Sequence, residues 1–273
     1  MQPLLPDWAA DVIDPQRPSP ARVYDHLLGG LTNFDADRRI AARLVEIVPE
    51  LAHTARAGRG FLQRAVEYLA DAGIDQFLDL GSGVPTAGNV HEIALRANPA
   101  ARVVYIDVDA VAVAVSRRLL AENSQAAMVQ ADFTDIDGVL AHPQVTAMLD
   151  FTRPMAILLV SVLHSVTDDA AAATLFKRLS AVIAPGSRVV LSHLTAEGDR
   201  EPVDRMFALA EQATGRGIRP RSRARDSGVA RRSDPRRSRP GAYGSLAAGS
   251  RRTAARGPCA GRLRRGRGQT LTP

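Results

Sequence analysis

Three aspartates stand at or beside the ends of short apolar segments, where a parallel sheet would bring them to one edge. Asp79 lies one residue before the end of its segment, and Asp107 and Asp132 follow the next two segments along the chain. An aspartate after a strand is often only the N-cap of the next helix, so each one alone has that simpler explanation. Three at successive strand ends indicate an edge that binds a ligand.

Each carboxylate suits one part of an amino-acid nucleoside. Asp107, with Val108 directly after it, could accept hydrogen bonds from both hydroxyls of a ribose. Asp79 could accept from an α-ammonium group. Asp132 could accept from the amino group of an adenine, while the ring of Phe133 packs on the base. Together these positions predict a ligand with an ammonium, a ribose and an adenine.

A glycine turn follows the first of these aspartates. Gly81 and Gly83 let the backbone pass close to a ligand, because no side chain stands in the way. The third glycine of the dinucleotide fingerprint is missing, and Val84 and Pro85 stand there instead. This counts against a nicotinamide-dependent oxidoreductase, which stays an alternative. An amino-acid nucleoside needs no pyrophosphate cradle.

One histidine stands where a reacting group would lie. His164 follows the apolar run 155–162, so it is expected at the same edge of the sheet, and it could act as a base toward an oxygen nucleophile. The alternative is a histidine that only shapes the floor of a pocket. His193 is a second candidate. No cluster of cysteine and histidine has the spacing of metal ligands, so no metal is expected.

Alternating segments place these residues on an α/β fold. Apolar segments of strand length alternate with helical ones, which is typical of a parallel sheet covered on both faces. The expected strands are 76–80, 102–106, 126–130, 155–162 and 188–191. The expected helices between and after them are 89–98, 109–122, 136–140, 168–183 and 200–213. Three further helices are expected before the first strand, over 20–28, over 35–48 and around 61–69.

The sequence also resembles a known family. The segments 20–30, 33–34, 77–86 with 89–92, and 158–164 look like the S-adenosyl methyltransferases of high-GC, actinobacterial-type bacteria. This family of the class I methyltransferase superfamily was long catalogued as a domain of unknown function. The resemblance covers about residues 19–218.

This resemblance implies the fold and the activity. It implies a Rossmann-like domain over 74–218 that binds S-adenosyl-L-methionine, and an N-terminal helical lid over 20–73. The activity implied is methyl transfer to an unidentified small molecule. The resemblance also places four lid residues near the cofactor: Tyr24, Gly29, Gly30 and Asn33. By residue type alone, Tyr24 could equally fill the core, and the two glycines could equally end a helix.

Composition limits the other classes of function. No apolar run approaches the roughly 18–20 residues of a membrane helix, and residues 1–19 read as a loose leader without a signal-peptide pattern. A single cysteine excludes an internal disulfide, so a cytoplasmic protein that acts away from membranes is expected. The oligomeric state cannot be inferred.

The last part of the chain has a different composition. Residues 219–273 carry sixteen arginines and two acids, while residues 1–218 are acidic overall. We expect this tail to be disordered, and we expect no strand in it, so the edge strands that usually complete such a sheet would be missing. Three interpretations stay open: the product of a shifted reading frame in a GC-rich gene, an arm that binds nucleic acid, and a solvated tail.

Overall fold

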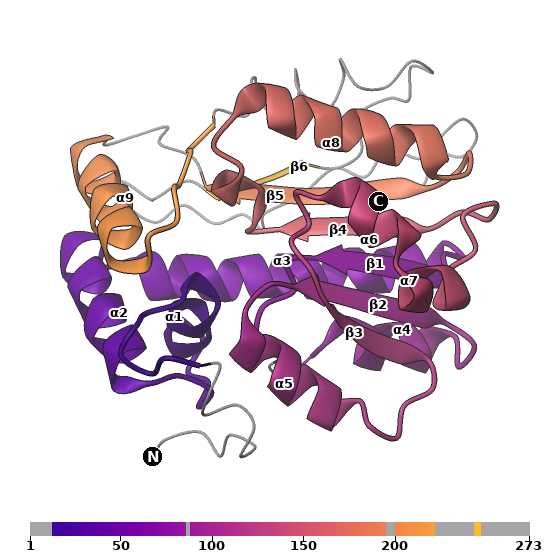
Figure 1. The fold of residues 1–273 in the computed structure, drawn as a ribbon, viewed down its shortest axis with the longest axis horizontal. Coiled ribbons are helices and arrows are strands. Elements are labelled where there is room, and N and C mark those ends of the chain that lie inside the picture. The colour runs from indigo at the N-terminus through magenta and orange to yellow at the C-terminus, as the bar shows by residue number, and fades with distance from the viewer. Residues whose placement is uncertain (1–12, 86–87, 195–199, 222–242, 247–273) are drawn as a thin grey trace, which may run out of the picture.

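The computed structural model describes residues 13–85, 88–194, 200–221 and 243–246, the last of these as backbone only. Within these ranges the strands form one sheet in the order β3-β2-β1-β4-β5-β6 (Figure 1). Every neighbouring pair of strands is parallel. The strands are β1 (Gln76–Leu80), β2 (Arg102–Asp107), β3 (Ala126–Gln130), β4 (Ala156–Val160), β5 (Arg188–Leu194) and β6 (Tyr243–Leu246). The predicted α/β, Rossmann-like sheet is confirmed.

The sixth strand corrects one expectation. The composition of residues 219–273 predicted no strand, yet Tyr243–Leu246 pairs in parallel with Leu191–Leu194 of β5. A short edge strand is held by main-chain hydrogen bonds to its one neighbour, and these leave no periodic pattern of side chains. The start of the predicted disordered tail is also corrected, because Arg219 donates from its main chain to the carbonyl of His164 and Arg221 is buried. Composition reports no such contact, since it depends on residues far away in the sequence. The remaining expectations for the tail concern residues outside those described.

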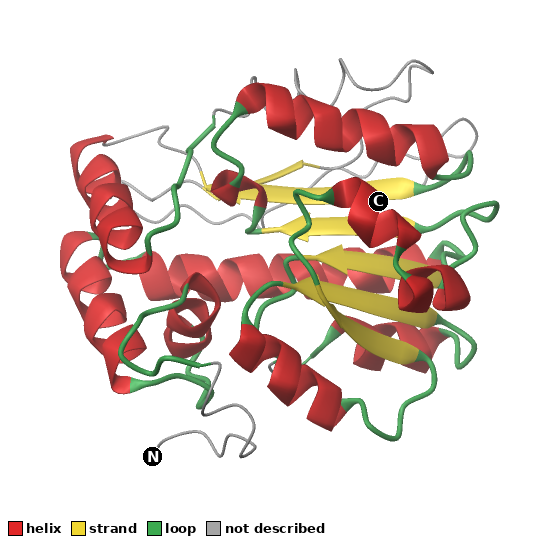
Figure 2. Cartoon of the chain, in the orientation of Figure 1, coloured by secondary structure: helices red, strands yellow, loops and turns green. Residues whose placement is uncertain are grey.

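Helices cover both faces of the sheet, as predicted (Figure 2). One face packs against apolar side chains of α3 (Leu51–Asp71), α4 (Val90–Ala97) and α5 (Ala110–Leu119). The other face packs against α6 (Ile136–Ala141), α7 (Pro143–Met148) and α8 (Asp169–Val182). Both faces of the central strands are therefore buried, which explains their continuous apolar sequences.

Two helices differ from the sequence prediction. Helix α7 was not predicted, and it begins with Pro143 directly after His142, whose Nδ1 accepts a hydrogen bond from the main chain of Gln144. Helix α3 begins at Leu51, well before the apolar pattern around Phe61. Its first turns bury Ala55 and Gly58, and such small residues give little apolar signal.

A third apolar cluster lies beyond the carboxyl ends of the strands (Figure 1). It joins α1 (Pro20–Leu27) and α2 (Asp35–Ile47) to α9 (Arg200–Thr214). The predicted lid, 20–73, contained α1, α2 and α3, and α9 was assigned to the main domain. The structure instead packs α3 on the sheet and joins α9 to α1 and α2, with Val203, Met206 and Phe207 of α9 in one cluster with Leu44 of α2. The described end of the expected leader is also packed, because Ile13 is buried with Phe34 and Val111.

No described helix has both the length and the apolar character needed to span a membrane. The described residues also contain no group of three or more His, Cys, Asp or Glu side chains that could hold a metal ion.

Candidate functional site

The loop after β1 is tied to the end of β2. The main-chain N–H groups of Gly81 and Ser82 both donate to the carbonyl of Ile106, at 2.8 and 3.0 Å. Gly81 and Gly83 have φ angles of 72° and 68°, which side chains other than glycine rarely adopt. The sequence pattern Gly-Ser-Gly therefore provides the two left-handed residues that turn the chain back over the sheet.

The two glycines serve different purposes. A Cβ atom at Gly81 would lie 2.2 Å from Cγ2 of Val162, so this glycine permits close packing against the loop after β4. A Cβ atom at Gly83 would meet nothing within 4 Å among the described residues. Open space therefore lies beside the backbone of Gly83, where a ligand can approach it.

Asp107 organises this loop rather than capping a helix. Its Oδ2 accepts a hydrogen bond from the main chain of Gly83 at 2.7 Å, and its Oδ1 accepts one from Asp109 at 2.8 Å. The N-cap of α5 is Asp109, which accepts from Val111 and Ala112. Burial raises the pKa of Asp107, and the hydrogen bonds from Asp109 and Gly83 oppose that rise. The capping explanation for Asp107 is thereby excluded, and its oxygens keep lone pairs for a ligand.

Asp79 is a buried carboxyl group whose pKa is about 7. It lies on β1 beside Tyr105 of β2. Burial raises its pKa to about 7; the charge of Arg59 acts in the opposite direction, and that of Asp107 adds to the rise. A cationic ligand group would stabilise the ionised form of Asp79.

A recess with about 310 Å³ of empty space, open solvent included, adjoins these residues. Among the residues that line it and were not predicted from the sequence are Arg59 of α3, Asn89 and Tyr105. Arg59 donates to Oδ1 of Asn89 at 3.0 Å. Tyr105 was detectable, because it stands two residues before Asp107 and so shares a face of β2. Arg59 gave no signal, because only the packing of α3 brings it to the sheet.

His91 also lines the recess, and it contacts Tyr105 of β2. The hydroxyl of Tyr105 accepts a hydrogen bond from the main chain of His91 at 2.8 Å and lies 2.8 Å from Nδ1 of the same residue. Burial lowers the pKa of His91. The contact fixes the first turn of α4 onto β2.

Tyr24 of α1 comes close to the same arginine. Its hydroxyl donates to the carbonyl of Ala55 at 3.0 Å. Burial raises its pKa, while the charge of Arg59 and a hydrogen bond with Ser161 oppose that rise. Ser161, directly after β4, has a φ of 56°, a strained value for a residue with a side chain. Helix α1 thus reaches both Arg59 and the end of β4.

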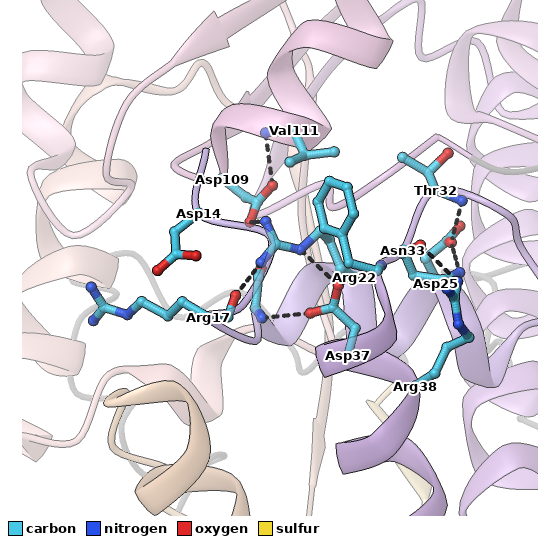
Figure 3. Close-up of polar contacts among 12 residues, drawn as sticks. Asp14, Arg17, Arg22, Asp25, Thr32, Asn33, Asp37, Arg38, Asp109 and Val111 are labelled. Carbon is cyan, nitrogen blue, oxygen red and sulfur yellow. Dashed lines mark hydrogen bonds and ion pairs between the residues drawn. The ribbon is translucent and has the colours of Figure 1, made fainter. Parts of the chain in front are cut away.

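The remaining predicted lid residues form a network of their own (Figure 3). Buried Asp25 accepts hydrogen bonds from the main chain of Thr32 at 2.9 Å and from Nδ2 of Asn33 at 2.8 Å. A Cβ atom at Gly30 would lie 2.0 Å from Oδ1 of Asp25, whereas one at Gly29 would meet nothing within 4 Å among the described residues. The structure thus uses Gly30 and Asn33 to hold Asp25, and leaves Gly29 in an open turn with a φ of 84°.

Of the residues predicted to contact the adenine base, some are exposed and one is buried. Asp132 is exposed, and its Oδ1 accepts from the main chain and hydroxyl of Thr134. Phe133 is buried in the core with Ile136 and Val139. Val108 is 39% exposed and follows β2 directly. An adenine could therefore contact Val108 and Asp132 at the surface, whereas Phe133 lies below them in the core.

His164 lies in a second cluster. It forms the middle of the 3-10 turn η2 (Leu163–Ser165), and its ring meets that of His193 edge to face, with centroids 5.9 Å apart. Its Nδ1 is buried and has no hydrogen-bond partner within the described ranges. Burial, and then the charges of His193 and Arg221, lower its pKa to about 3, so the ring is neutral at pH 7. No described contact joins His164 to Asp79 or Asp107.

Comparison with known proteins agrees with this geometry. The profile of the family described as S-adenosyl methyltransferase matches residues 6–228. A crystal structure of a candidate methyltransferase from Thermobifida fusca is 38% identical, with a TM-score of 0.73, and the match covers 79% of this chain and 80% of that one. A DUF574 family protein from Streptomyces avermitilis is 35% identical, with a TM-score of 0.75, over 80% of this chain and 83% of that one. Among curated proteins no match was found.

The family profile spans most of the chain, including the glycine loop, the three strand-end aspartates and η2. It favours a methyltransferase over the nicotinamide-dependent alternative, in agreement with the missing third glycine. The two crystal structures share the fold across about four fifths of the sequence. The chain therefore belongs to the S-adenosyl methyltransferase family and is a methyltransferase whose cofactor is S-adenosyl-L-methionine.

Proposed function

We propose that this protein transfers a methyl group from S-adenosyl-L-methionine to an acidic hydroxyl group of a small molecule. The observation that supports this is the neutral, half-buried His164 in the turn after β4, whose buried Nδ1 has no hydrogen-bond partner within the described part of the chain. A histidine ring that can take up a proton, and whose Nδ1 has no hydrogen-bond partner among the described residues, suits a methyl acceptor whose hydroxyl group must lose its proton.

The residues of the first cluster fit the cofactor. Asp107 has free lone pairs for the ribose hydroxyls, and the open space at Gly83 allows the backbone to contact the ligand. Asp79, buried and with a raised pKa, would hold the α-ammonium group. Val108 and Asp132 would contact the adenine base, and Phe133 would support them from the core. In the lid, Tyr24 and Gly29 would close over the cofactor, while Gly30 and Asn33 would act by holding Asp25.

The cofactor supplies a methyl group that its sulfonium already activates. The chain must then bring the acceptor into line and take up its proton, and correct orientation alone contributes greatly to such a transfer. We assign the proton to His164, and His193 forms one wall beside it.

The low pKa of His164 narrows the class of acceptor. Burial and the nearby charge of Arg221 both disfavour an imidazolium at this position. A weak base accepts a proton readily only from an acidic group. We therefore expect phenols and enols to be methylated, and aliphatic alcohols and amines to be poor acceptors.

The acceptor class can be tested with isotope-labelled cofactor. We expect label in the product with a substituted phenol or an enolised diketone, and far less with the matched cyclohexanol and aniline. His164→Gln should lower kcat by about 100-fold or more, which is the usual contribution of a general base, and leave the Kd for the cofactor unchanged. Transfer to the aniline alone, or an unaltered rate in His164→Gln, would contradict the proposal.

The pH dependence of cofactor binding tests Asp79. Only the ionised carboxylate can pair with an ammonium group, so affinity is complete above the pKa of about 7 and is lost as the pH falls. The Kd should rise about fivefold from pH 7 to pH 6 and roughly tenfold more from pH 6 to pH 5, since each unit below a pKa removes nine tenths of the ionised form.

Titration calorimetry at pH 5, 6 and 7 measures this dependence, and buffers of different ionisation enthalpy report the proton released on binding. Asp79→Asn should bind more weakly at pH 7 and lose most of the dependence. A wild-type Kd that stays constant between pH 7 and pH 5 would rule out Asp79 as the partner of the ammonium.

A further inference from the structure

The chain after α9 returns to the turn that carries His164. The main-chain N–H of Arg219 donates to the carbonyl of His164 at 2.7 Å. The guanidinium of Arg219 also pairs with Oδ2 of Asp169, in the first turn of α8, at 3.5 Å. This segment thus joins η2 to the start of α8.

Arg221 of the same segment is a buried cation, with a side chain that is 0% exposed. Its Nη1 donates to the carbonyl of Leu163 at 3.3 Å, and its Nη2 donates to that of Val166 at 2.6 Å. Its Nε donates to Oδ1 of Asp169 at 2.9 Å. One rigid guanidinium therefore holds main-chain carbonyls on both sides of His164, and the planar fork of arginine suits this better than lysine would.

The same guanidinium determines which nitrogen of His193 carries the proton. Nδ1 of His193 lies 2.6 Å from the carbonyl oxygen of Leu194, which can only accept, so Nδ1 is protonated. Nε2 lies 3.4 Å from Nη1 of Arg221, which can only donate, so Nε2 carries a lone pair. A second proton on Nε2 would point at a cation. His193 is therefore a neutral ring in the Nδ1–H form.

We propose that Arg221 is a positioning residue: it holds the η2 turn that carries His164, and it fixes His193 as the neutral Nδ1–H tautomer against which His164 packs. This inference rests on the proposed function only where it gives His164 a role in proton uptake. Among the described residues, the charged groups near the two rings are Arg219 and Arg221 from the returning segment and Asp169 from α8.

The electrostatics of the two rings agree with this assignment. Burial lowers the pKa of His193 to about 4; the carbonyl of Leu194 opposes that shift, and the charge of Arg221 adds to it. The pKa of His164 is lowered as well, in part by the same guanidinium. Both rings therefore stay uncharged over the pH range in which Asp79 changes its ionisation.

Nuclear magnetic resonance of the full chain, with ¹⁵N-labelled histidine, tests the proposal directly. His193→Gln and His164→Gln assign the two rings. In the wild type at pH 6 we expect a neutral His193 with the proton on Nδ1. In Arg221→Met, where Asp169 is left without this cation, His193 should gain a proton with a midpoint at least one pH unit higher. Arg178→Met, which removes an exposed arginine paired with Asp137, should change neither ring.

Several outcomes would overturn the proposal. An imidazolium or an Nε2–H tautomer at His193 in the wild type at pH 6 would do so, and this result needs no variant. An unchanged His193 in folded Arg221→Met would do so as well. Should Arg221→Met fail to fold, Arg221→Lys keeps the charge without the planar fork, and a full set of wild-type ring signals in that variant would exclude the positioning role.

Calorimetry and kinetics separate this inference from the proposed function. Arg221→Met should bind S-adenosyl-L-methionine within about twofold of the wild type, because the cofactor residues lie on the other cluster, while kcat falls about tenfold or more. If the wild-type chain binds no cofactor, the proposed function fails but the tautomer assignment stands. If binding and transfer occur and His193 is charged, only the role of Arg221 fails.

Discussion

Replacing Asp107 by alanine is expected to weaken the binding of S-adenosyl-L-methionine by about 100-fold or more. The carboxylate would accept from the ribose hydroxyls, and hydrogen bonds to a charged group contribute about 1.5–3 kcal/mol each. In addition, its two oxygens hold the main chains of Gly83 and Asp109, so alanine also releases the loop that approaches the ligand. Titration calorimetry on the folded variant measures the loss.

Two further variants serve as controls for this experiment. Asp107→Asn keeps the shape but only one acceptor oxygen, so its Kd should fall between those of the wild type and Asp107→Ala. Asp137→Asn removes an exposed carboxylate that pairs with Arg178 and should bind like the wild type. A cofactor Kd in Asp107→Ala within about threefold of the wild type, with an intact thermal transition, would show that Asp107 does not hold the ribose.

Replacing Asp37 by alanine is expected to lower the free energy of unfolding by about 3–5 kcal/mol, the usual effect of breaking a buried ion pair. Asp37 is fully buried and accepts hydrogen bonds from Nε of Arg22 at 3.0 Å, from Ser19 at 2.9 Å and from Phe34 at 2.8 Å (Figure 3). Alanine would leave a buried guanidinium and two main-chain donors without this acceptor. Chemical denaturation without cofactor measures the change.

Arg22 explains why this loss should extend beyond the lid. Its guanidinium lies 3.8 Å from Oδ2 of Asp109, the N-cap of α5, and 5.1 Å from the centre of the Phe34 ring. Arg22 therefore links α1 to Asp109, whose main-chain N–H donates a hydrogen bond to Asp107. In Asp37→Ala we expect weaker cofactor binding as well as lower stability, because the α5 end of the site loses this support.

Matched substitutions distinguish the effect of losing the Arg22–Asp37 ion pair from the effect of any substitution in helix α2. Arg22→Met should cost less than Asp37→Ala, because Asp37 keeps its two main-chain donors. Asp35→Ala removes an exposed aspartate of the same helix, paired with Arg38, and should leave the free energy of unfolding almost unchanged, because surface ion pairs contribute little. Equal stabilities of Asp35→Ala and Asp37→Ala would refute the assignment of Asp37 as the anchor of the lid.

Local patterns were enough to predict most of the sheet and the first cluster. Strands β1 to β5 are continuous apolar runs because both of their faces are buried, and such runs are visible in the sequence. The glycines after β1 and Asp107 after β2 follow from the same pattern, because parallel strands end at one edge. Whether Asp107 was a ligand residue or a helix cap stayed open, because both uses place an aspartate after a strand.

Contacts between distant segments decided the rest. Arg59 reaches Asn89 only because α3 packs beside α4, and Arg221 reaches His193 only because the chain returns after α9. Strand β6 depends on the free edge of β5, which no local composition reports. The sequence by itself determined the family, through the segments that resemble its members, and it determined the sheet and the aspartates at its edge, because these follow from periodicity and strand ends. Only the tertiary structure decided which carboxylates are helix caps, which arginines are buried and which histidine is held neutral, because hydrogen bonds between remote residues set all three.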